Sequence, residues 1–125
     1  MSDIYFPPRE LAVMSVLWRL GSASVTEVRE ALEEDLAYTS VLSALQTLEE
    51  KGFVRHEEQG RAFRYIPRVA RKTAKASAVK RLVQKLFDGE TRLLATELMS
   101  NRALSDDDLR QLRALLDQRL SGRDT

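Results

Sequence analysis

The side chains with the clearest chemical potential are hydroxyls and arginines between residues 38 and 64. Hydroxyl groups on one helical face can hydrogen-bond base edges or phosphates, and arginines can pair with phosphates. This combination makes nucleic acid the first ligand to consider. The candidate contact residues are Tyr38, Thr39, Ser40, Ser43, Thr47, Arg61 and Arg64.

The hydroxyls need a helix to place them on one side. Residues 38–51 are expected to form it, because Val41, Leu45 and Leu48 recur at helical spacing and a glycine follows the last turn. With these apolar side chains turned inward, the hydroxyls lie on the outer face. No carboxylate shares that face before Glu50, so the face suits an anionic partner.

Two further helices should precede this one. Residues 8–20 carry a stripe that includes Leu11, Met14 and Trp18, and a glycine ends it. A second, short helix follows Ser24, whose pairing with Glu27 is typical of a capping box.

A β-hairpin is predicted after the helix over 38–51. Its strands are expected at 53–57 and 61–66, around a tip at 58–60, with Phe63 and Tyr65 on the anchoring face and Arg64 on the other. Three helices and a hairpin outline a winged helix-turn-helix, in which the helix over 38–51 enters the major groove of DNA. A protein-interaction module with the same element order is the alternative.

The rest of the chain changes in composition. Helices are expected over 70–87, around 93–98 and after Ser105, where three aspartates fill a first turn. Such helices cannot bury their leucine stripes alone, so a second copy of the chain should cover them. The expected dimerisation residues are Val79, Leu82, Leu86, Leu94, Leu98, Leu109, Leu112 and Leu116.

The predicted fold is mostly α with a small β-hairpin. A winged-helix DNA-binding domain is expected over 1–69 and a helical, three-helix dimerisation domain over 70–125. Between residues 53 and 72 the positive charge is concentrated, although the net charge is only +1.

Other function classes find little support in the composition. The chain has no cysteine and one histidine, His56, so thiolate and multi-histidine metal sites are excluded and no cofactor is expected. Nor is an enzyme expected, because general acid–base catalysis needs a group with a tuned pKa in a cleft. No apolar run is long enough for membrane insertion, and a cytoplasmic protein is expected. Glu57, which precedes the predicted tip, and Glu58, which begins it, should repel a phosphate, and the sequence does not explain their presence there.

Several motifs together resemble the penicillinase repressor family, of the BlaI/MecI type with the CopY repressors as relatives. They are Glu10-Leu11-Ala12-Val13-Met14-Ser15-Val16-Leu17-Trp18, Thr26-Glu27-Val28, Tyr38-Thr39-Ser40-Val41, Leu48-Glu49-Glu50-Lys51-Gly52 and Gly60-Arg61-Ala62-Phe63-Arg64-Tyr65-Ile66-Pro67. The resemblance implies a homodimeric repressor on a promoter dyad of double-stranded DNA, often with TACA/TGTA half-sites. It assigns base reading to Thr39, Ser40 and Ser43, and wing contacts to Arg61 with Arg64.

The resemblance is weakest for the inducing signal. Copper-responsive relatives use a C-terminal cysteine cluster, which this chain lacks. Members that respond to β-lactams are cleaved at an Asn-Phe bond under the control of a membrane sensor protease. Here the aligned pair is Glu97-Leu98, and Asn101-Arg102 is out of register. A sensor protease as partner is therefore implied only by the resemblance.

Overall fold

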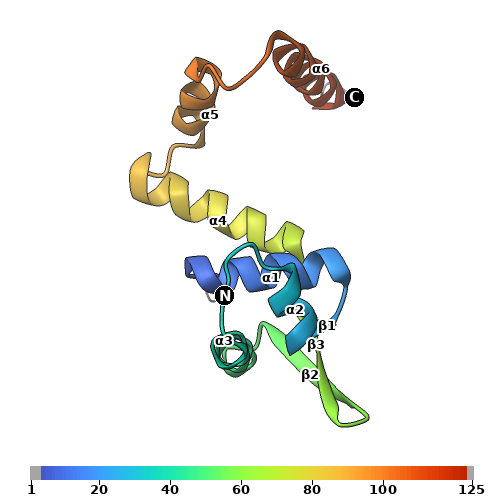
Figure 1. The fold of residues 1–125 in the computed structure, drawn as a ribbon. Coiled ribbons are helices and arrows are strands. Elements are labelled where there is room, and N and C mark those ends of the chain that lie inside the picture. The colour runs from blue at the N-terminus through green and yellow to red at the C-terminus, as the bar shows by residue number, and fades with distance from the viewer. Residues whose placement is uncertain (1–3, 124–125) are drawn as a thin grey trace. The chain divides into compact units, whose positions relative to one another are not determined.

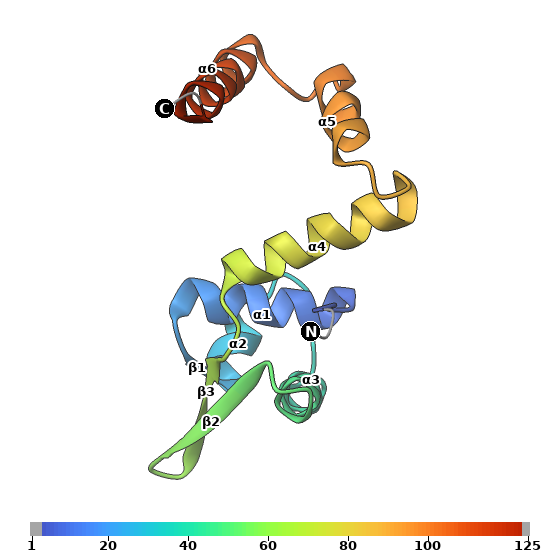
Figure 2. The same cartoon turned by 180° about the vertical axis from the view of Figure 1, so that it is seen from behind.

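The computed structural model describes residues 4–123, and Figures 1 and 2 show it from opposite sides. The predicted mostly α fold with a small sheet is confirmed. The chain divides into two compact units after Val79, within the fourth helix. In chain order the elements are α1 (Pro8–Leu20), β1 (Ala23–Ser24), α2 (Val25–Ala31), α3 (Tyr38–Glu50), β2 (Val54–Gln59), β3 (Ala62–Pro67), α4 (Arg71–Leu86), α5 (Thr91–Ser100) and α6 (Asp106–Arg123).

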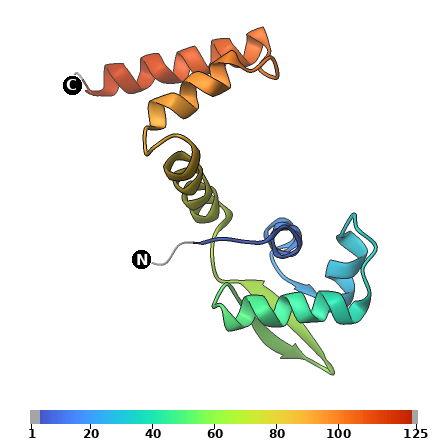
Figure 3. The same ribbon diagram turned by 90° about the vertical axis from the view of Figure 1, so that its left-hand side faces the viewer.

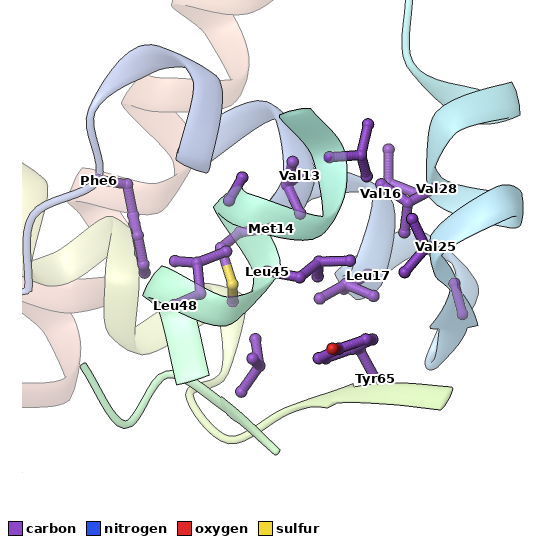
Figure 4. Close-up of a cluster of buried hydrophobic side chains, with 14 of the residues drawn as sticks. Phe6, Val13, Met14, Val16, Leu17, Val25, Val28, Leu45, Leu48 and Tyr65 are labelled. Atoms are coloured by element: carbon purple, nitrogen blue, oxygen red, sulfur yellow. The ribbon is translucent and has the colours of Figure 1, made fainter. Parts of the chain in front are cut away.

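One hydrophobic core holds the first unit together. The inner face of α3 packs against α1 and the sheet, and Figure 4 shows the side chains of Leu17, Leu45 and Tyr65 within this core. Burying one such side chain stabilises a fold by about 1.5–3 kcal/mol. The largest side chains that are fully buried are Tyr65, Met14, Leu17, Leu45, Leu48, Val13, Val28, Val41 and Val54.

The sheet has a third strand that the sequence pattern does not predict. β1 pairs antiparallel with β3, which places Ala23 opposite Tyr65 and Ser24 opposite Arg64. The strand order is therefore β1-β3-β2. Two residues are too few to show the alternation by which strands are recognised in a sequence. Ser24 also caps α2: its Oγ accepts from the Glu27 N–H, so the predicted capping box is confirmed.

The hairpin is tighter than expected. We expected Glu58 and Gln59 at the tip, and this is wrong: both lie in β2, opposite Phe63 and Ala62. Gly60, with φ at +65°, makes it possible to reverse the chain over only two residues. As a result Arg61 lies in the turn itself.

The start of α4 is attached to the first unit. The Trp18 indole N–H donates to the Val69 carbonyl over 2.8 Å, and the Arg71 guanidinium lies 5.8 Å from the centre of the Trp18 ring. Ser77 Oγ accepts from the Ile4 N–H over 3.2 Å and lies 3.3 Å from the Ile4 carbonyl oxygen, to which it donates. These contacts explain why the first compact unit includes residues beyond the hairpin.

The helices from the middle of α4 onward leave much of their apolar surface uncovered. α5 has no buried residue, and α6 begins with a capping box in which Ser105 and Asp108 exchange two hydrogen bonds of 3.0 Å. None of the helices in the part of the chain described here is long and apolar enough to cross a membrane. The large apolar side chains exposed from the middle of α4 onward are Val79, Leu82, Leu86, Leu98, Met99, Leu109, Leu115, Leu116 and Leu120.

Candidate nucleic-acid interface

The outer face of α3 presents the hydroxyls that the sequence singled out. Thr39 and Ser43 are exposed, Ser40 and Thr47 are half-buried, and Tyr38 is 45% exposed at the start of the helix. Within residues 4–123, none of the four aliphatic hydroxyls has a hydrogen-bond partner. Their hydrogen-bonding capacity is therefore available to a ligand.

The sequence reasoning missed Gln46, which is exposed on the same face. It follows Ser43 by three residues and Thr39 by seven, and this helical spacing places all three side chains on one side of α3. The amide donates and accepts at once, so it can make a bidentate pair with adenine. The periodicity that identified the hydroxyl face was sufficient to identify Gln46 as well.

A shallow hollow of about 370 Å³ adjoins this face where the beginning of α1 meets α3. Its carboxylate, Glu10, is only 14% exposed and accepts a hydrogen bond from Lys51 Nζ over 3.0 Å. The charge of Glu10 is therefore compensated within the chain. The residues that line the hollow are Arg9, Glu10, Thr39, Ser40, Ser43, Ala44 and Thr47.

His56 attaches the hairpin to the end of α3. Its Nδ1 lies 2.6 and 2.8 Å from the two carboxylate oxygens of Glu49. Its ring lies 4.5 Å from that of Phe63 and 5.7 Å from that of Tyr65, between centroids. Tyr65 is buried, as expected of an anchor, and burial raises the pKa of its phenol. Phe63 is the weaker anchor, because 43% of it is exposed.

The carboxylates of the hairpin differ in their surroundings. Glu57 is paired with Arg55 over 2.7 Å, on the face of the hairpin opposite to His56 and Tyr65. Glu58 has no ion-pair partner among the residues that the structure describes. Repulsion of a phosphate by Glu57 is thus reduced by its neighbour.

The two predicted arginine contacts have different environments. Arg61 is exposed in the turn and has no partner within the described range. Arg64 is half-buried: its Nε donates to Ser22 Oγ and its Nη1 to Glu27 Oε1, both over 2.8 Å. Arg64 therefore attaches β3 to the start of α2, and a contact between Arg64 and DNA stays a prediction.

The pairing of Glu27 predicts an acid-sensitive contribution to stability. The Ser24 backbone N–H, which donates to the carboxylate, lowers the pKa of Glu27, and Arg64 lowers it further. A carboxyl group with a lowered pKa in the folded state stabilises the fold above its unfolded pKa, and this contribution is lost as the pH falls through the folded pKa. Glu27→Gln should therefore lower the free energy of unfolding at pH 7 and have little effect at about pH 3.

Urea unfolding of the wild type and of Glu27→Gln between these pH values measures the change in the free energy of unfolding. Glu30→Gln is the matched control, because Glu30 is exposed on the same helix and has no ion pair within residues 4–123. If Glu27→Gln lowered the free energy of unfolding equally at both ends of the pH range, the prediction would be contradicted.

Comparison with known proteins gives relatives over most of the chain. A family model described as "Penicillinase repressor" matches residues 6–118. The methicillin resistance regulatory protein MecI of Staphylococcus aureus (strain N315) is 23% identical over 112 residues, which are 88% of this chain and 91% of MecI. The penicillinase repressor of Bacillus licheniformis is 23% identical over 111 residues, 87% of each chain.

A solved structure matches the winged-helix part. The DNA-binding domain of the repressor BlaI, determined in solution, is 28% identical and superposes with a TM-score of 0.51. The match covers 56% of this chain and 88% of that domain. The predicted winged-helix fold and the predicted family resemblance are both confirmed.

Proposed function

Because the chain belongs to the penicillinase repressor family of DNA-binding transcriptional repressors, we propose that it acts as a homodimer on a palindromic promoter operator. The observation that carries the proposal is the outer face of α3, where hydrogen-bonding side chains lie exposed. The operator is double-stranded DNA with half-sites of the TACA/TGTA type, and the protein works in the cytoplasm, where that DNA lies.

The proposed reading element is α3. The major groove is about 12 Å wide, enough for one α-helix. Thr39, Ser43 and Gln46 would face the base edges, with the threonine methyl against a thymine methyl and the glutamine amide on adenine N6 and N7. Half-sites that contain both adenine and thymine offer both partners.

The hairpin is the proposed second contact. Arg61 occupies the turn, so its guanidinium can reach a phosphate or the minor groove without first breaking an ion pair inside the described chain. The His56–Glu49 contact supports this role, because it holds the hairpin against the last turn of the reading helix.

Residues 70–125 form the proposed dimerisation domain. Six of the eight predicted interface residues are exposed, and Leu94 and Leu112 are half-buried. Covering each leucine would contribute up to about 1.5–3 kcal/mol. A two-fold dimer would present two copies of α3 to the two halves of a palindrome.

The proposal does not extend to a membrane sensor protease. Glu97 and Leu98 differ from the Asn-Phe pair at which family members are cleaved, and they lie within α5. A protease would have to unwind this helix before its active site could bind the peptide bond.

The hairpin contact predicts a change in salt dependence. Arg61→Ala should weaken binding to operator and random DNA alike, because the phosphate backbone is the same in every DNA sequence. The slope of log affinity against log salt should become shallower by about 0.9 for each half-site. Fluorescence anisotropy over a range of salt concentrations measures the slope. Arg110→Ala, which removes an equal charge from α6, should leave it unchanged; a slope that Arg61→Ala does not alter would disprove the contact.

The reading face predicts a loss of specificity. Gln46→Ala should reduce the preference for operator over random DNA by about 1–3 kcal/mol, because one bidentate base contact is lost. Competition binding of the two DNAs measures this preference. Gln84→Ala in α4 is the control and should have no effect, whereas equal losses on both DNAs would show that Gln46 does not read bases.

The exposed leucines predict the oligomeric state. Analytical ultracentrifugation at micromolar concentration should give twice the chain mass of 14.2 kDa. Leu116→Glu should shift the equilibrium towards the monomer, because a carboxylate cannot be buried in an apolar interface without a partner. Leu20→Glu, at a leucine of α1 that is 47% exposed against 58% for Leu116, should leave the dimer intact. A wild-type protein that sediments as a monomer would refute the proposal.

A further inference from the structure

Arg9 lies next to the proposed reading face, although it belongs to a different helix. It is in the first turn of α1 and lines the hollow together with hydroxyl residues of α3, including Thr39 and Ser43. Nothing in the sequence pattern of α1 distinguishes Arg9 from an ordinary solvated arginine. Its role can only be recognised once the fold brings residues 9 and 39–47 together.

The electrostatic character of the hollow favours an anion. Two charged residues line it, and the negative one, Glu10, is mostly covered and hydrogen-bonded to Lys51. The positive one, Arg9, is half-exposed, and its only ion pair in the described chain joins Nη2 to Glu34 Oε1 over 3.5 Å. An exposed pair at that distance contributes little free energy, so the guanidinium can exchange Glu34 for a phosphate at small cost.

The position of α1 relative to α3 indicates which phosphate would bind. In Figure 3, α3 lies across the view, with α1 end-on above it and the hairpin tip below it. A helix in the major groove has a sugar-phosphate backbone on each side. If Arg61 in the hairpin contacts one backbone, the first turn of α1 lies towards the other.

We propose that Arg9 and the adjoining hollow bind a backbone phosphate of the operator, on the side of α3 opposite to the hairpin. The guanidinium pairs with the phosphodiester oxygens, and Thr39 and Ser40 line the same hollow with hydroxyls that can donate hydrogen bonds. This inference rests on the proposed function, since it requires α3 to lie in the groove. Two cations would then hold the reading helix from both sides.

Three variants separate phosphate binding from a structural role. Arg9→Ala should weaken binding to operator and random DNA by about twofold to tenfold, as expected for an exposed charge-assisted contact, and Arg9→Lys should restore much of it. Glu34→Gln should have the opposite effect and strengthen binding, because it removes the carboxylate that competes for Arg9. If Arg9 only stabilised the fold through its ion pair, Arg9→Ala and Glu34→Gln would weaken binding together.

A second measurement locates the phosphate. Single phosphates of an operator half-site are replaced in turn by neutral methylphosphonates, and the affinities of wild type and Arg9→Ala are compared at each position. At one position, neutralisation should weaken the wild type but have no further effect on Arg9→Ala. The salt slope should fall by about 0.9 per half-site in Arg9→Ala but stay unchanged in Arg19→Ala, the control at the other end of α1.

The outcomes distinguish this inference from the proposed function. A wild type that does not prefer operator over random DNA would overturn the proposed function itself. A wild type that binds its operator specifically, with Arg9→Ala equal to it in affinity and salt slope, would overturn only the role of Arg9. The role of Arg9 would also be overturned if the affinity lost in Arg9→Ala added fully to the affinity lost on neutralising each phosphate in turn. No single phosphate would then be the partner of Arg9.

Discussion

The packing of the inner face of α3 determines the rest of the first unit. Val41, Leu45 and Leu48 are fully buried, so the helix has only one rotational setting in which its apolar stripe is covered. That setting fixes which side chains face outward. A rotation of about 100°, one residue along the helix, would expose a leucine and bury a hydroxyl without a partner. The same packing constraint therefore determines both the hydrophobic core and the proposed reading face.

Several carboxylates of the first unit are paired with basic side chains. Glu10, Glu27, Glu49 and Glu57 each lie within hydrogen-bonding distance of a basic side chain. Several of these pairs also join elements: α1 with the end of α3, α2 with β3, and α3 with β2. Individually, exposed ion pairs stabilise a protein by at most about 1 kcal/mol. Their larger effect is on the electrostatic potential, because each of these four carboxylates lies beside a basic side chain.

Local patterns in the sequence were sufficient for the helices and the family, but not for contacts between distant residues. The stripe of α3, the Ser24–Glu27 capping box and the hydroxyl face all follow from spacings of three and four residues. The pairing of β1 with β3, the His56–Glu49 contact and the attachment of Arg64 to Ser22 depend on chain segments brought together by folding. Gln46 is different, because the helical period alone places it on the outer face of α3. It was missed because the candidate contact residues on that helix were chosen among hydroxyl side chains.

The absence of internal hydrogen bonds to the α3 hydroxyls within residues 4–123 has an evolutionary consequence. A side chain that supports nothing inside its own protein can be replaced without loss of folding stability. Thr39, Ser43 and Gln46 are thus open to substitution while the buried stripe beneath them is held constant. On the proposed role of α3 as the reading helix, related repressors built on the same core can diverge in the promoters they recognise through a few codon changes, and duplicated copies can acquire separate regulons without first acquiring new folds.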